Sequence, residues 1–108
     1  MVFALTPPDL VCPDGMAMAI EGGIWVCQFN SACLLRYDRH GALTCVLHVP
    51  VPRPTSCCFG GAGMSTLLIT RARFGMSPAE LADCPAAGNI FRVRVPVAGV
   101  PRYQFREV

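Results

Sequence analysis

The sequence predicts an all-β fold built from short antiparallel strands, and three observations support this prediction. Short apolar or alternating runs are separated by Gly, Pro, Asn and Asp, which is typical of strands joined by turns. The first half of the chain holds four consecutive runs of this kind, and one propeller blade requires four antiparallel strands. The first predicted inner strand and its counterpart near Ser56 are about 40 residues apart, a typical blade period.

The predicted strands of the first half are short, and each ends at a turn signal. The turn Pro13-Asp14-Gly15 precedes an apolar strand, and Glu21-Gly22-Gly23 closes it into a hairpin with a strand that carries Trp25. The expected strands are at 2–5, 16–20, 24–29, 33–37 and 43–49. Residues 2–49 are therefore predicted to contain the end of one blade and one full blade.

The second half begins after a proline-rich connection, because Pro50, Pro52 and Pro54 lack the amide proton that a strand ladder needs. Residues 55–108 are predicted to form a last blade, with strands at 55–59, 66–70 and 90–95 and a weak outer strand at 103–106. One short helix is expected at 78–82. Ser77 is its N-cap, Pro78 its first helical residue and Glu80 the acid of a capping box.

Composition limits the classes of protein to consider. With 108 residues, 53% of them hydrophobic and 15% charged, the chain is one small domain or a piece of a larger one and is too apolar for disorder. Its apolar runs are too short to cross a membrane, since Pro, Gly or Arg interrupts each of them. The nine basic residues are all Arg and are scattered, so we expect no nucleic-acid partner.

Cysteine usage indicates the compartment. The chain has seven Cys, an odd number, and its N-terminus lacks the basic region of a secretory signal, so reduced thiols and a cytoplasmic location are expected. Cys57 and Cys58 are adjacent and should point to opposite faces of a strand, which prevents them from chelating together. No Cys-x-x-Cys spacing is present, so most of the cysteines are expected to be buried structural thiols.

Several motifs, each weak alone, occur together in a fixed order along nearly the whole chain. They are Pro13-Asp14-Gly15-Met16, Glu21-Gly22-x-Ile24-Trp25-Val26, Arg36-Tyr37-Asp38, Val51-Pro52-Arg53-Pro54-Thr55-Ser56-Cys57-Cys58-Phe59-Gly60-Gly61, Thr66-Leu67-Leu68-Ile69-Thr70, Gly75-Met76-Ser77-Pro78-x-Glu80-Leu81 and Ala87-Gly88-x-Ile90-Phe91. In this order they resemble the C-terminal part of the senescence marker protein/gluconolactonase/luciferin-regenerating enzyme family, the regucalcin-like proteins. Two departures are Ala19, where the family usually has a second acid, and Ser31-Ala32-Cys33 in place of Gly-Gly-Arg.

The resemblance implies a six-bladed β-propeller that holds one divalent metal ion in its central channel and hydrolyses sugar lactones. The acid of the family's Pro-Asp-Gly turn is a metal ligand, which implies this role for Asp14, the single catalytic and metal-binding residue expected in this chain. The family implies Ca²⁺ first, with Zn²⁺, Mg²⁺ and Mn²⁺ as alternatives. The other ligands, a Glu and an Asn, belong to blades that this sequence does not contain.

Other interpretations stay open beside the metal-dependent lactonase. Asp14 also fits a plain turn acid between Pro and Gly. Ser56 lacks the Gly-x-Ser-x-Gly context of a hydrolase nucleophile, so nucleophilic catalysis is not expected. About two blades cannot close a ring of roughly four to eight. The chain is therefore expected to be a fragment. The alternative function is a non-catalytic truncated chain or half-propeller that binds a partner or a metal without chemistry, with self-association or a partner supplying the missing blades.

Overall fold

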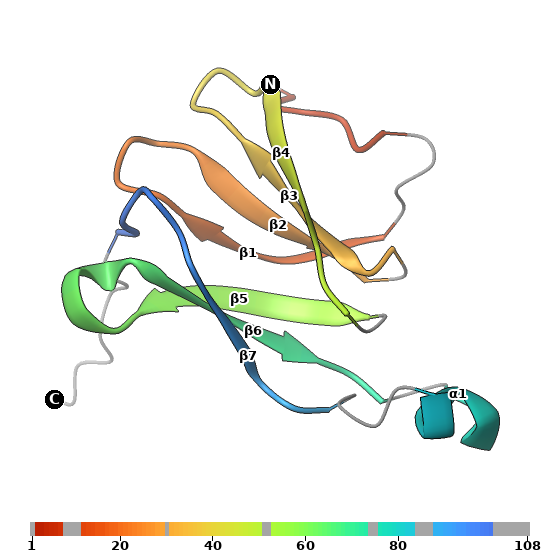
Figure 1. Ribbon diagram of the computed structural model, residues 1–108. Helices are drawn as coiled ribbons and strands as arrows, with labels where there is room; N and C mark the ends of the chain where they lie inside the picture. Colours follow the sequence, from red (N-terminus) through yellow and green to blue (C-terminus); the bar gives the residue numbers. More distant parts are fainter. Residues whose placement is uncertain are drawn as a thin grey trace, which may run out of the picture.

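In a computed structural model of the chain, residues 2–7, 12–29, 31–50, 53–73, 76–83 and 88–100 are described. They form two antiparallel sheets (Figure 1). The first sheet has the order β1-β2-β3-β4, with β1 at Pro13–Met18, β2 at Ile24–Gln28, β3 at Cys33–Tyr37 and β4 at Leu43–His48. The second sheet has the order β5-β6-β7, with β5 at Pro54–Gly60, β6 at Thr66–Arg71 and β7 at Phe91–Arg94.

The all-β prediction is confirmed, and seven of the predicted strands are found within a few residues of their expected positions. The strand expected at 2–5 is wrong, because residues 2–7 contain no strand. Ala4 instead packs against the outer face of the first sheet, which is the face that points away from the second sheet, and the Phe3 carbonyl lies against Gly41. An apolar segment that covers a sheet face needs hydrophobic side chains but no backbone ladder. The strand expected at 103–106 lies outside the described residues.

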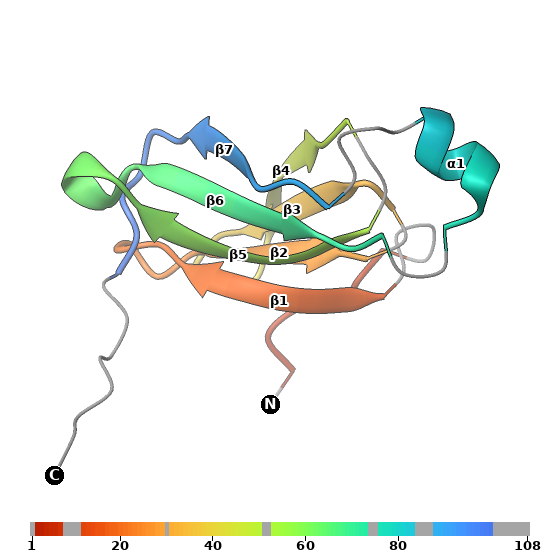
Figure 2. The same ribbon diagram turned by 90° about the horizontal axis from the view of Figure 1, so that it is seen from below.

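The main core lies between the two sheets. It contains Ala17, Ala19, Trp25, Cys27, Leu34, Cys57, Phe59, Leu67, Ile69 and Val95, which we call the inter-sheet core. Figure 2 shows β1 and β5, the first strand of each sheet, side by side, with β4 and β7 on the opposite side of the molecule. This arrangement brings residues about 40 positions apart in sequence into contact across the two sheets.

The opposite face of the first sheet carries a second cluster, formed by Val26, Cys33, Leu35 and Tyr37, which we call the outer-face cluster. Alternate residues of β2 and β3 therefore enter the two clusters, and both strands are buried on both faces. This explains why 24–28 and 33–37 read as nearly continuous apolar runs rather than as alternating ones.

Two predicted turns have the local chemistry that their residues indicate. After β1, the Gly22 amide donates to the Ala19 carbonyl at 2.9 Å, and Gly22 has φ +95°, a conformation that favours glycine. Between β3 and β4, the Asp38 carboxylate accepts hydrogen bonds from the amides of Ala42 (3.0 Å) and His40 (2.8 Å). These bonds lower the pKa of Asp38 below its usual value.

The short helix is confirmed as α1, Pro78–Asp83, and Figure 1 shows it beside the sheets rather than between them. The capping box is reciprocal: the Glu80 amide donates to Ser77 Oγ at 3.2 Å, and the Ser77 amide donates to Glu80 Oε1 at 3.1 Å. A short 3₁₀ turn, η1 at Ala62–Met64, joins β5 to β6. Among the described residues, no helix is long and apolar enough to cross a membrane.

The segment that follows β7 ties the second sheet back to the first. The Ile20 amide donates to the Ala98 carbonyl at 2.8 Å, and the Val100 amide donates to the Met18 carbonyl at 3.0 Å. Gly99 also donates to the Met64 carbonyl at 2.9 Å. Residues 98–100 therefore connect the end of β1 to the turn after β5 through backbone hydrogen bonds. These bonds add to the apolar contact between the sheets.

Candidate functional site

Asp14 lies inside β1 and not in a turn before it, which corrects the expected strand at 16–20. Pro13 pairs with Gln28, but the next pair is Met16 with Val26, so the register shifts between Pro13 and Met16. Three residues of β1 therefore span a two-residue step of β2, as in a β-bulge. Bulges redirect side chains next to sites, and the Asp14 side chain is exposed here.

The bulge is held against the second sheet at Gly15. A Cβ atom built on Gly15 would lie 2.6 Å from Ser56 Cβ and 2.7 Å from Ser56 Cα, closer than real Cβ contacts. β1 and β5 therefore approach one another at a point where only glycine fits. This contact fixes the position of Asp14, the preceding residue, relative to the second sheet.

Two thiols of the inter-sheet core lie near Asp14. Cys27 on β2 and Cys57 on β5 are both buried, at 0% and 3% exposed. A hydrogen bond with Cys57, together with burial and the nearby charges of Cys57 and Asp14, raises the pKa of the Cys27 thiol far above its usual value. Cys27 is therefore a neutral thiol, close enough to Asp14 to experience the field of its carboxylate.

The donor set around Asp14 fits only part of a divalent-metal site. Within the described residues, no hydrogen bond or ion pair engages the Asp14 carboxylate, so its hard oxygen atoms are available to a cation. No group of three or more His, Cys, Asp and Glu side chains that could hold a metal occurs in the described parts of the chain. Since Ca²⁺ takes six to eight oxygen ligands, Asp14 fits as one ligand of a site that needs further donors.

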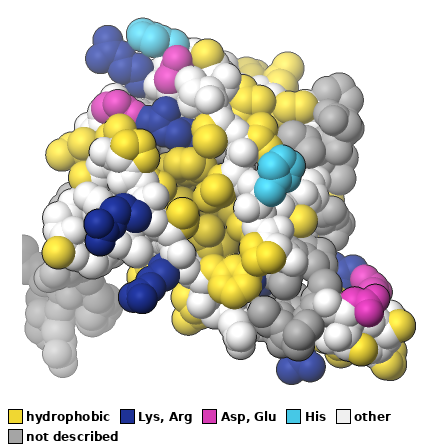
Figure 3. Space-filling model, in the orientation of Figure 1, with side chains coloured by type: hydrophobic (Ala, Val, Ile, Leu, Met, Phe, Trp, Pro, Cys, Tyr) yellow, Lys and Arg dark blue, Asp and Glu magenta, His cyan; other side chains and the backbone are white. Residues whose placement is uncertain are grey.

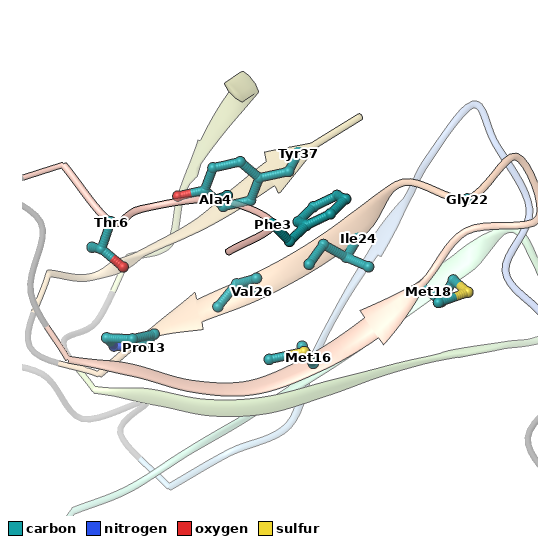
Figure 4. A pocket seen from close by; sticks show the side chains of 10 residues that line it. All are labelled: Phe3, Ala4, Thr6, Pro13, Met16, Met18, Gly22, Ile24, Val26 and Tyr37. Carbon is teal, nitrogen blue, oxygen red and sulfur yellow. The ribbon is translucent and has the colours of Figure 1, made fainter. Parts of the chain in front are cut away.

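An apolar cavity lies on the outer face of the first sheet, and Asp14 does not line it. The cavity encloses about 480 Å³ and is lined by Phe3, Ala4, Thr6, Pro13, Met16, Met18, Gly22, Ile24, Val26 and Tyr37, which we call the outer groove. Figure 4 shows Ile24 and Val26 pointing from β2 toward the N-terminal segment that carries Phe3 and Ala4. Apart from Thr6 and the Tyr37 hydroxyl, its lining offers apolar side chains, which suits an apolar surface better than a sugar.

A second apolar surface faces the viewer in Figure 3, where hydrophobic side chains form a band between β4 and β7. Leu47 of β4, Val93 of β7 and Val97 line this band. The same residues pack against the inter-sheet core, so the band is the outer margin of that core.

Sequence reasoning missed two buried polar residues. Gln28 is fully buried, and neither its Oε1 nor its Nε2 has a hydrogen-bond partner among the described residues. Arg71 is 6% exposed, donates twice to the Asn89 carbonyl and lies over the Phe91 ring. Burial lowers the pKa of Arg71. One sequence feature could have indicated the burial of Gln28: it is a polar residue at the end of the apolar run 24–28. The sequence around Arg71 contains no comparable indication that its side chain is buried.

Comparisons with known proteins agree with this architecture. A model of the SMP-30/Gluconolactonase/LRE-like region matches residues 1–73. Regucalcin from Oryctolagus cuniculus is 39% identical over 95 residues, and regucalcin from Danio rerio is 43% identical over 95 residues. Each alignment covers 86% of this chain and 32% of the relative. The chain therefore spans about a third of the length of the curated relatives that it matches.

Two solved structures share the fold. The calcium-binding protein regucalcin from Agrobacterium tumefaciens superposes with a TM-score of 0.87 and 28% identity, over 97% of this chain and 36% of that one. A luciferin-regenerating enzyme gives a TM-score of 0.73 and 25% identity, over 86% and 32%. The two sheets are thus part of a propeller of the regucalcin type, and the chain belongs to the SMP-30/gluconolactonase/LRE-like family.

Proposed function

We propose that this chain is the C-terminal portion of a divalent-metal-dependent sugar lactone hydrolase and that Asp14 is its one metal ligand. Residues 2–49 would supply the end of one blade and a full blade, and residues 55–108 the last blade. The observation that carries the proposal is the exposed Asp14 carboxylate on the β1 bulge, in a chain whose family includes gluconolactonase-like proteins. The cytoplasm is the proposed location, since the six described cysteines are all thiols.

The chemistry of the donor supports a hard cation. A carboxylate oxygen suits Ca²⁺ and accepts Zn²⁺, Mg²⁺ or Mn²⁺. We place Ca²⁺ first because the regucalcin from Agrobacterium tumefaciens is a calcium-binding protein. A bound cation in such a site polarises a carbonyl oxygen and lowers the pKa of bound water. This chain's own part is to hold the Asp14 carboxylate in place, through the bulge of β1 and the close contact of Gly15 with Ser56. The sugar lactone and the remaining ligands would meet Asp14 only in a completed ring.

We expect the isolated chain to bind Ca²⁺ weakly and to open lactones no faster than buffer, because one carboxylate cannot replace six or more oxygen ligands. The positive test is a chimera in which residues 1–108 replace the matching third of rabbit regucalcin. In that chimera, Asp14→Asn should lower Ca²⁺ affinity by about 100-fold or more, since even outer-shell partners are typically worth 10–100-fold. Calorimetry measures the affinity, and a lactone-opening assay measures the turnover.

The matched control is Glu21→Gln, which also removes one exposed carboxylate from the same hairpin. Glu21 pairs with Arg36 and not with the bulge, so this variant should keep both affinity and turnover. Equal losses in Asp14→Asn and Glu21→Gln would contradict a ligand role for Asp14. Tight Ca²⁺ binding by the isolated chain that survives Asp14→Asn would contradict it as well.

A second candidate function is a non-catalytic half-propeller that binds a partner carrying the missing blades. The observation that favours it is the exposed apolar surface of β1, where Met16 and Met18 are 52% and 54% exposed. This function needs no metal. A lactone-opening assay on the chain mixed with the rest of a relative's ring separates the two functions, because only the first predicts turnover that depends on Asp14.

A further inference from the structure

The Cys27 and Cys57 thiols meet across the contact between the two sheets. Cys27 belongs to β2 and Cys57 to β5, and both side chains are in the inter-sheet core. The Cys57 thiol lies 3.8 Å from the Trp25 carbonyl oxygen, two residues before Cys27 on the same strand. The two thiols also share a hydrogen bond. Their sulfur atoms are therefore neighbours, although the residues are far apart in the sequence.

The other described cysteines have different surroundings. Cys58 is next to Cys57 but is only half-buried and points to the other face of β5. Cys33 lies in the outer-face cluster, on the opposite side of the first sheet. Cys12 and Cys45 are exposed. Among the described cysteines, Cys27 and Cys57 are thus the two that the fold brings into one cluster.

We propose that Cys27 and Cys57 are a redox-sensitive pair, which a peroxide converts into a disulfide that joins the two sheets behind Asp14. One thiolate attacks hydrogen peroxide, forming a sulfenic acid and releasing hydroxide, which takes up the thiol proton as water. The second thiol then attacks the sulfenic sulfur, the S–S bond forms and water leaves. In sum, two thiols lose two electrons and two protons, and one hydrogen peroxide becomes two waters.

Burial sets the rate of this reaction. Both thiols are almost inaccessible, and the raised pKa of Cys27 keeps it protonated, whereas the thiolate is the reactive form. Oxidation therefore requires the sheets to part briefly, and it should be slower than oxidation of the exposed Cys45. Once formed, the disulfide closes a loop of about 30 residues and prevents the sheets from separating. It would thereby hold β1, and with it Asp14, against β5, and this consequence does not depend on a bound metal.

The test treats the full chain with hydrogen peroxide, blocks remaining thiols with iodoacetamide and measures the intact mass and the thermal midpoint. The intact mass of the peroxide-treated chain, taken before alkylation, should be 2 Da lower than that of the reduced chain. Its thermal midpoint should be about 10 °C higher, and dithiothreitol should reverse both changes. Cys57→Ala should abolish both changes, and the matched control Cys58→Ala should keep them. Circular dichroism of the reduced variants checks that they fold.

Peptide mapping of the oxidised wild-type chain under non-reducing conditions needs no variant and decides the pairing directly. Fragment ions that join Cys27 to Cys57 support the proposal. A disulfide that joins any other two cysteines, or oxidation to sulfinic acids without the loss of 2 Da, would overturn it. So would a disulfide that forms at the same rate in Cys57→Ala as in the wild type.

Discussion

Gly15→Ala is expected to destabilise this chain by forcing β1 and β5 apart. The added Cβ would lie 2.6 Å from Ser56 Cβ and 2.7 Å from Ser56 Cα, and a backbone atom cannot move aside as a flexible side chain can. The two sheets would have to separate locally and loosen the inter-sheet core. Overpacking of this kind typically costs about 1–3 kcal/mol, which for a chain of this size lowers the thermal midpoint by roughly 10 °C. Thermal unfolding followed by circular dichroism measures the change.

Two further variants test whether the close contact between Gly15 and Ser56 causes the loss of stability. Gly60→Ala also adds a methyl group in a strand, but its nearest neighbour is Leu68 Cδ1 at 3.3 Å, the end of a side chain that can shift, so it should cost much less. Ser56→Gly in the Gly15→Ala background removes the Ser56 side chain and should restore part of the stability. If Gly15→Ala matched Gly60→Ala in stability, the close approach of β1 and β5 at this point would be refuted.

We expect the chain to self-associate at micromolar concentration, through the outer face of the first sheet. One face of this sheet is covered by the second sheet, whereas the other carries the outer-face cluster and the outer groove, with Met16 and Met18 about half exposed. Because the chain spans about a third of its relatives, a further sheet of the same kind is the occupant that we propose for this face. Apolar surfaces of this sort pair with another chain when their own partner is missing.

The double variant Met16→Thr/Met18→Thr should shift the chain from oligomer to monomer in sedimentation velocity, since it removes the exposed apolar side chains of β1 but keeps strand propensity. The control Ile90→Thr also replaces an exposed apolar side chain by threonine, but Ile90 (67% exposed) lies just before β7 of the second sheet, away from the outer face of the first. It should leave association unchanged. A wild-type chain that stays monomeric would contradict the prediction. A control variant that alone becomes monomeric would move the contact to the second sheet.

Local sequence patterns predicted the elements because their causes are local. Alternating and apolar runs placed the strands, glycines and Asp38 placed the turns, and the reciprocal bonds of Ser77 and Glu80 placed α1. The segment 2–5 was misassigned because an apolar run that covers a sheet face has the same composition as a short strand. The start of β1 was predicted three residues too late because a bulge is a feature of the pairing between two strands. The sequence of one strand does not show how its residues align with those of the neighbouring strand.

For the candidate site too, some features could be predicted from the sequence and others depend on the packing of the two sheets. The order of motifs along the chain was enough to predict the fold class, the family resemblance and the choice of Asp14 as the candidate ligand. The contacts of Gly15 with Ser56 and of Cys27 with Cys57, and the burial of Gln28, became visible only once the two sheets were packed together. Each of these facts depends on how the sheets meet or on which face of a strand is covered. Such packing is a long-range property that neither residue periodicity nor turn chemistry specifies.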